Sequence, residues 1–256
     1  MNKKKITIVS GIITFLAACA LIIVETFIEF QVKAKLAFGI AERVLLVIAV
    51  ICGMFLSDYK LKFKPTGGYV PFIAGLFVVF ANFPLECLIR GSLVINEDGW
   101  GMLLFVLSCV ATGIFEEIMF RGLLFSLIGD MTKKRKYGEV EAILLTSALF
   151  GLTHLMNLFV GANPGATFLQ VGYSFLIGCM CNVVLVCSKS MLLPIILHTL
   201  FNIGGTLTSS GVASGSQWDD ISIIIMAVIS VIASAVIIFY YFKRRSSAAQ
   251  RSDSQL

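Results

Sequence analysis

The chain has 256 residues, of which 58% are hydrophobic and 14% are charged, and its mean hydropathy is +0.94. Charged residues make up about a quarter of an ordinary soluble domain, so this composition excludes a soluble globular protein and indicates a polytopic membrane protein. The net charge of +5 comes from basic residues in the connecting segments. It is a topology signal, and no nucleic-acid partner is expected.

Apolar stretches long enough to cross a bilayer recur along the whole chain. A transmembrane helix needs about 20 apolar residues. Eight stretches meet this requirement: 6–30, 36–57, 69–89, 100–128, 141–160, 166–187, 190–208 and 221–242. The first is longer than the apolar region of a signal peptide, ~7–15 residues, so it is expected to remain as a helix. We predict an all-α fold with eight transmembrane helices, one intramembrane domain over residues 1–242, and a disordered polar cytoplasmic tail over 243–256.

Lysine and arginine residues are divided unequally between the two sets of connecting segments. If both termini are cytoplasmic, fifteen of them lie on the cytoplasmic side and three, Lys33, Lys35 and Arg90, lie on the other. Cytoplasmic loops of membrane proteins carry an excess of basic residues. The sequence therefore predicts a multi-pass protein of the cell membrane with both termini in the cytoplasm.

Three ionisable residues interrupt the apolar stretch from Gly113 to Phe125. A charge at the bilayer centre costs ~2.5–3.5 kcal/mol, so Glu116, Glu117 and Arg121 require partners or a water-filled cavity. Glu117 and Arg121 are four residues apart and lie on nearly one helix face, where they can pair. Glu116 points about 100° away. Arg121 thus neutralises Glu117 locally, and Glu116 remains available for catalysis.

The two histidines of the chain both lie in predicted spans. At a rise of ~1.5 Å per residue, Glu116 and His154 each lie about 20 Å above the cytoplasmic boundary, and His198 lies about 14 Å above it. Asn202 follows His198 by one helical turn and shares its face. These residues, from three helices, are expected to converge.

A carboxylate beside an imidazole can hold a water molecule and take its proton. We expect Glu116 to be the general base and His154 to orient the water and shuttle the proton. A tetrahedral intermediate at an amide carbonyl develops negative charge on oxygen, and His198 and Asn202 are suitable donors to it. The combination indicates hydrolysis of an amide bond within the membrane. The other ionisable residues of the first two spans, Glu25, Glu29, Glu42 and Arg43, are interpreted as structural.

Three motifs carry a resemblance to a known family. They are Glu116-Glu117-Ile-Met-Phe-Arg121-Gly, the segment Thr146-Ser-Ala-Leu-Phe150-Gly-Leu-Thr-His154, and His198-Thr-Leu-Phe-Asn202. In this order they resemble the CPBP group of CAAX proteases and bacteriocin-processing enzymes, also called the Abi family.

The resemblance implies an eight-helix membrane endopeptidase whose site lies in a cavity open toward the cytoplasm and the membrane. It implies that Glu116 and His154 activate the water and that His198 and Asn202 form the oxyanion hole, with Glu117 and Arg121 supporting. The expected partner is a membrane-associated or lipidated protein or peptide. Removal of the last three residues of a prenylated protein, bacteriocin maturation, self-immunity and anchoring of surface proteins all stay open, and no oligomeric state is predicted.

Other interpretations remain beside this one. Glu116, His154 and His198 are an alternative zinc-binding set, which would make the protein a metalloprotease. The chain has no His-Glu-x-x-His segment, and an asparagine stands where an oxyanion donor is wanted, so we expect no cofactor. A non-enzymatic membrane immunity or scaffold protein would keep the same polar network for helix packing. A proton-coupled transporter is disfavoured because no internal repeat is visible.

Overall fold

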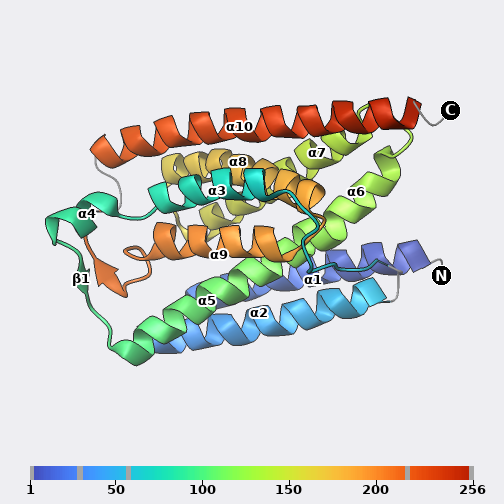
Figure 1. Cartoon of the computed structure of the whole chain (residues 1–256). Helices are drawn as coiled ribbons and strands as arrows, with labels where there is room; N and C mark the ends of the chain where they lie inside the picture. Colours follow the sequence, from blue (N-terminus) through green and yellow to red (C-terminus); the bar gives the residue numbers. More distant parts are fainter. Residues whose placement is uncertain (1–2, 28–30, 56–58, 217–219, 254–256) are drawn as a thin grey trace.

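The structure is a computed structural model that describes residues 3–27, 31–55, 59–216 and 220–253, and these residues form a helical bundle (Figure 1). The elements in chain order are α1 (Lys3–Phe27), α2 (Val32–Phe55), α3 (Tyr69–Ala81), α4 (Leu85–Arg90), β1 (Val94–Ile95), α5 (Gly99–Glu117), the π-helix η1 (Ile118–Leu124), α6 (Phe125–Thr132), α7 (Gly138–Thr153), the 3-10 helix η2 (His154–Val160), α8 (Pro164–Ser188), α9 (Leu192–Thr206), β2 (Ala213–Ser214) and α10 (Asp220–Asp253). The predicted all-α class is confirmed; β1 and β2 form one short antiparallel pair between two connecting segments.

Within the described ranges, five helical segments are long and apolar enough to cross a membrane. They are Val32–Phe55, Gly99–Thr132, Gly138–Val160, Pro164–Ser188 and Ser222–Ser247. Three shorter apolar helical segments, Ile8–Ala18, Tyr69–Ala81 and Leu192–Thr206, accompany them. Large apolar side chains also cover the outside of the bundle, for example Ile232 at 59% and Phe239 at 69% exposure. A polytopic membrane fold is therefore confirmed, while the number of eight spans stays a prediction.

The expected span 69–89 is divided in the structure. Helix α3 ends at Ala81 and α4 begins at Leu85. Pro84 stands between them; it lacks a backbone N–H and disfavours the helical conformation at the residue before it. The side chain of Asn82, at the end of α3, instead donates a hydrogen bond to the Phe201 carbonyl of α9 at 2.9 Å. With 13 residues, α3 is ~20 Å long and does not reach across a ~30 Å hydrocarbon core by itself.

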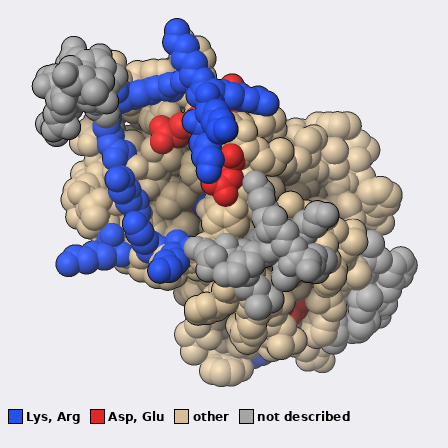
Figure 2. Space-filling model, turned by 90° about the vertical axis from the view of Figure 1, so that its right-hand side faces the viewer, with Lys and Arg blue, Asp and Glu red and all other residues tan. Residues whose placement is uncertain are grey.

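Basic side chains gather at one end of the bundle. Helix α1 begins and α10 ends there, on the right of Figure 1, and lysines and arginines cover this face in Figure 2. Helix α10 continues to Asp253, so residues 243–253, expected to be disordered, extend this helix. Two hydrogen bonds hold the extension: Arg244 Nη1 donates to the Val186 carbonyl at 2.7 Å and Arg245 Nη2 to the Lys136 carbonyl at 2.6 Å. We call this face the basic end.

Three helix packings position the site. Helix α5 packs against α2 on one side and against α9 on the other, and α7 packs against α8. Gly113 of α5 allows the close approach of α9, because a Cβ atom there would lie 2.6 Å from Thr199 Oγ1 and 3.2 Å from the Thr199 nitrogen. The motif residues of α5, η1, η2 and α9 are thereby brought to the middle of the bundle.

Candidate active site

The buried charge pair lies where the long central helix changes its hydrogen-bonding pattern. Glu117 is the last residue of α5 and Arg121 belongs to the π-helix η1. Arg121 Nη1 lies 3.1 Å from Glu117 Oε1, and both side chains have 0% exposure. The contact has the distance of an ion pair without the angles of a hydrogen bond. The pairing expected from the four-residue spacing is confirmed, and π-helical turns of this kind occur frequently at functional sites.

His198 lies between the two glutamates. Its Nδ1 is 2.7 Å from Glu117 Oε1, and its Nε2 is 3.0 Å from Glu116 Oε2. An ionised carboxylate can only accept hydrogen bonds, and Arg121 keeps Glu117 ionised, so Nδ1 of His198 carries a proton. Nε2 is then directed at Glu116, whose side chain is 24% exposed. Glu117 and Arg121 therefore fix the orientation of the imidazole from behind.

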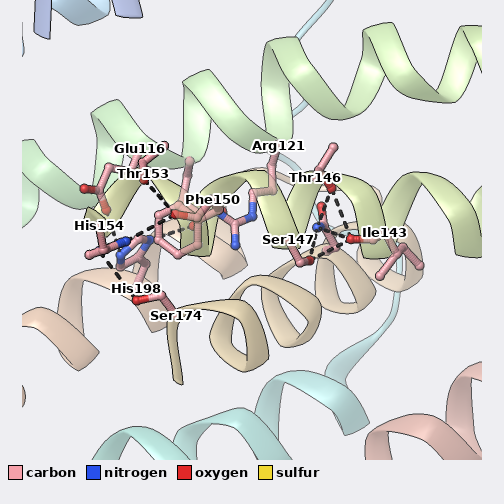
Figure 3. A network of polar contacts seen from close by, with 12 residues as sticks. Glu116, Arg121, Ile143, Thr146, Ser147, Phe150, Thr153, His154, Ser174 and His198 are labelled. Atoms are coloured by element: carbon pink, nitrogen blue, oxygen red, sulfur yellow. Dashed lines mark hydrogen bonds and ion pairs between the residues drawn. The ribbon is translucent and has the colours of Figure 1, made fainter. Parts of the chain in front are cut away.

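The Phe150 ring lies between Arg121 and the two histidines (Figure 3). Its ring centroid lies 4.7 Å from Arg121 Cζ, 5.3 Å from the His154 ring and 5.5 Å from the His198 ring. Both imidazoles meet it edge to face, at 89° and 81°. Phe150 thus covers the buried guanidinium and packs against both imidazoles. Apart from its place in the second motif, no role was predicted for Phe150, because a phenylalanine in an apolar helix is usually a core residue.

His154 lies at the junction between α7 and the 3-10 helix η2. Its Nδ1 contacts the Phe150 carbonyl at 3.2 Å, and its Nε2 lies 3.5 Å from Ser174 Oγ on α8. We expected His154 to be the imidazole beside Glu116. Among the described residues, the ring in direct contact with Glu116 is that of His198, and His154 faces the same cavity from the opposite helix.

A cavity of about 900 Å³ joins the predicted residues. Glu116, His154, His198 and Asn202 all line it, from α5, η2 and α9. The convergence expected from helical depth is therefore present. In the described part of the chain the Asn202 side chain has no hydrogen-bond partner, while its carbonyl accepts a bond from Thr206 Oγ1 at 2.7 Å. The amide is free to bind a ligand in the cavity.

The cavity extends from these residues toward the end of the bundle opposite the basic end. Its remaining walls come from the first turns of α2, α8 and α10 and from the segment after α9, and include Val32, Leu36, Leu169, Ser209, Ser210 and Ile223. In Figure 1 these segments lie at the left. The resemblance implied a cavity open toward the cytoplasm. A cavity that opens to the cytoplasm and termini that lie in the cytoplasm exclude each other in this structure, because α1 begins and α10 ends at the opposite end of the bundle.

Arg43, for which a structural role was predicted, lies beside the site. It lines the cavity, and its Nη1 donates to the Gly39 carbonyl at 3.0 Å and lies 3.5 Å from Glu42 Oε2. Glu42, by contrast, is 4% exposed and is not part of the cavity wall. The side chains of Glu25 and Glu29 lie outside the described residues.

The donor atoms do not fit the alternative zinc set. Zinc ligation by His198 needs a ring nitrogen without a proton aimed at the metal, and both of its nitrogens contact carboxylates. The closest polar neighbours of His154 are a carbonyl and a hydroxyl. Within the described ranges no three histidine, cysteine, aspartate or glutamate side chains are grouped to hold a metal ion. No step of the reaction is therefore derived through a metal.

Comparison with known proteins gives one family. The model of the type II CAAX prenyl endopeptidase Rce1-like family matches residues 98–204, a range that contains all three motifs. Neither curated proteins nor solved structures gave a match. The match over residues 98–204, which hold the glutamates and histidines of the site, confirms the resemblance to the CPBP group of CAAX proteases.

Proposed function

We propose that this protein is an intramembrane endopeptidase that hydrolyses a peptide bond of a membrane-associated or lipidated substrate with a water molecule activated by Glu116. One observation carries the proposal: Glu116, His154, His198 and Asn202 line a single cavity inside an apolar bundle. A carboxylate with partial exposure, two imidazoles and an unpaired amide are the groups that amide hydrolysis requires. The match to the CAAX prenyl endopeptidase family supports the same reaction class.

In the proposed reaction Glu116 takes a proton from a water molecule held between its carboxylate and His154. The water oxygen attacks the carbonyl carbon, and the carbonyl oxygen becomes an oxyanion. His198 Nε2–H and the Asn202 amide donate to that oxygen, and each such donor is worth about 10²–10³ in rate. Glu116 returns the proton to the amide nitrogen as the C–N bond breaks. The products are a new carboxyl terminus and a new amino terminus.

The charges of the site support His198 as a donor. Buried charges are stable only when they are paired. Glu116 and Glu117 carry two negative charges, and Arg121 carries one positive charge at 3.1 Å from Glu117. A protonated His198 between the carboxylates balances the group and provides an N–H at both ring nitrogens. Its Nε2–H then moves from Glu116 to the oxyanion when the substrate binds.

Replacement of the general base tests the proposal. Glu116→Gln keeps the size and hydrogen-bonding capacity of the side chain and removes the base, so we expect cleavage to fall by about 10²–10⁴-fold. The matched control is Glu141→Gln, at the basic end and outside the cavity wall. The measurement is a comparison of membrane proteomes from cells carrying each variant, in which peptide termini produced by the wild type are sought.

We expect these termini to disappear with Glu116→Gln and to persist with Glu141→Gln. If a well-inserted Glu116→Gln chain yields the same termini and the full cellular phenotype, the protein acts instead as a membrane immunity or scaffold protein.

A further inference from the structure

An apolar groove of about 440 Å³ lies between α3 and α10, which pack side by side (Figure 1). It shares no residue with the cavity of the candidate active site. Two small buried side chains, Ala74 and Ala233, form its floor, and larger exposed ones such as Ile73, Phe77 and Ile232 form its walls. The groove has the size of a ligand site. Every side chain that lines it is apolar, so it suits a hydrocarbon chain.

One end of the groove lies at the basic end of the bundle. Val70, at the start of α3, belongs to its lining. Just before α3, the Thr66 N–H donates to the Ser188 carbonyl at the end of α8 at 2.9 Å. On the other side, Arg244 of α10 donates to the Val186 carbonyl of the same helix at 2.7 Å. The start of α3, the end of α8 and the basic part of α10 therefore meet here, and we call the place marked by Thr66, Ser188 and Arg244 the groove mouth.

Three exposed lysines adjoin the groove mouth. Lys64, Lys189 and Lys243 each lie within two residues of a residue that marks it. In the part of the chain that the structure describes, none of the three forms an ion pair, whereas Arg135 between α6 and α7 lies 2.6 Å from a Glu141 carboxylate oxygen. Basic residues at the end of an apolar groove between membrane helices are the arrangement that binds an anionic lipid headgroup.

Lys243 lies on the same face of α10 as the groove. Ile232 and Val236 line the groove, and Tyr240 and Lys243 continue this stripe at intervals of four and three residues. Residues at these intervals are neighbours on a helix surface. Tyrosine is enriched where the hydrocarbon of a membrane meets the headgroups. Half-buried Tyr240 and exposed Tyr69, the first residue of α3, therefore mark the level at which an acyl chain in the groove would end and its headgroup begin.

We propose that the groove holds one acyl chain of an anionic phospholipid, and that Lys243, together with Lys64 and Lys189, binds its headgroup phosphate. An acyl chain gains no hydrophobic energy by leaving the bilayer for the groove, because both are apolar. The lysines therefore provide the preference for this lipid, and the groove fixes its position. A second copy of the chain fits less well, since two copies inserted in the same direction would bring their lysines together. The proposal is independent of the proposed function.

The test compares phosphatidylglycerol with phosphatidylcholine that carries the same acyl chains. Each lipid is added to the full chain in detergent micelles, and bound lipid is counted by native mass spectrometry. The melting temperature is measured on the same samples, because a ligand that binds the folded state raises it. Two variants address the two parts of the site. Lys243→Gln removes a charge at the groove mouth, and Val236→Phe fills the groove from a wall position with 40% exposure.

Each variant has a matched control. Lys60→Gln removes another exposed lysine of the basic end, which follows Tyr59, the partner of Asp130 on α6 at 2.9 Å. Val231→Phe makes the same change as Val236→Phe at a position with 70% exposure that does not line the groove. Five residues separate the two valines, so their side chains point about 140° apart on α10.

We expect the wild type to bind one phosphatidylglycerol more tightly than phosphatidylcholine and to melt at a higher temperature with it. Lys243→Gln should weaken phosphatidylglycerol binding about 5-fold, which corresponds to about 1 kcal/mol for one basic residue near an anionic headgroup. The double variant Lys64→Gln, Lys243→Gln should weaken it about 25-fold. Val236→Phe should remove the bound lipid with either headgroup, and both controls should bind as the wild type does.

Four results would overturn the proposal. Equal affinity of the wild type for both lipids would show that no anionic headgroup is recognised. An equal loss in Lys60→Gln and Lys243→Gln would assign the effect to the charge of the whole basic end. Undiminished binding by Val236→Phe would place the lipid elsewhere, and a dimer that Val236→Phe dissociates would make the groove an interface between copies. Cleavage enters none of these measurements, so failure of the proposed function is distinguishable from failure of this site.

Discussion

At the scale of single residues, the site depends on a carboxylate and a guanidinium that are both removed from solvent. Glu117 and Arg121 each have 0% side-chain exposure and lie 3.1 Å apart. Removing one member of a buried pair leaves an uncompensated charge, whereas an exposed pair contributes about 1 kcal/mol or less. Because Glu117 Oε1 also lies 2.7 Å from Nδ1 of His198, the pair links stability to the orientation of the imidazole that we propose to be catalytic.

Arg121→Leu should lower the free energy of unfolding by about 3–5 kcal/mol, since Glu117 remains buried without its partner. Arg90→Leu removes another arginine from an i,i+4 pair, here with Glu86 and at 66% exposure, and should change stability by about 1 kcal/mol or less. Denaturant unfolding of the purified chains in detergent micelles measures both. Similar losses for the two variants would contradict a special role for burial.

At the scale of helices, the contact between α5 and α9 decides whether the motifs meet. Gly113 faces Thr199, the residue next to His198, and a Cβ atom at Gly113 would lie 3.2 Å and 3.3 Å from the Thr199 nitrogen and Cα. Backbone atoms cannot move aside as a flexible side chain does. A larger residue at this position therefore pushes the whole of α9 away from both glutamates.

Gly113→Ala should lengthen the contacts of His198 to Glu116 and Glu117 and reduce cleavage by up to about 100-fold, the effect of a misplacement near 1 Å. Its control is Gly129→Ala on α6, where an added Cβ meets nothing within 4 Å. The peptide termini that the wild type produces in the membrane proteome, normalised to the amount of inserted protein, give the comparison. Unchanged activity in Gly113→Ala would show that the α5–α9 distance is not critical.

At the scale of the whole molecule, the basic end and the cavity opening lie at opposite ends of the bundle. Basic loops favour the cytoplasmic side, so the side at which α2 and α10 begin is expected to face away from the cytoplasm. We propose that the substrate reaches the cavity from that side or from the surrounding lipid. Exposed apolar side chains along its walls, such as Leu169 at 70% and Ile223 at 50%, provide a surface for a lipid chain or an apolar peptide.

Cysteine labelling measures this orientation. Ser209→Cys, on the cavity wall, should react with a membrane-impermeant maleimide added to intact cells, because its side of the bundle faces outward. Lys134→Cys, exposed at the basic end, should react after permeabilisation only. The unmodified chain gives the background of its native cysteines. The reverse pattern would place the basic end outside and the cavity opening in the cytoplasm, as the family resemblance implied.

The features that depend on local spacing could be predicted from the amino-acid sequence. Apolar length predicted helices, and the four-residue interval predicted the Glu117–Arg121 pair, because an α-helix repeats every 3.6 residues. Helical rise predicted that Glu116 and His154 share a level, with His198 nearer the cytoplasmic boundary. Pro84 also indicates a break within the expected span 69–89. A count of apolar residues does not detect this break.

Which of these groups touch each other depends on how the helices pack in three dimensions. Depth in a helix follows from counting residues, but the direction in which a side chain faces its neighbours depends on how helices rotate and approach. The close packing at Gly113 brings His198 rather than His154 against Glu116, and the packing of α7 places Phe150 between Arg121 and the two imidazoles. The cavity opens where the helix ends diverge, and this also places Arg43 on the cavity wall. The spacing of residues in the sequence does not predict which helix ends diverge.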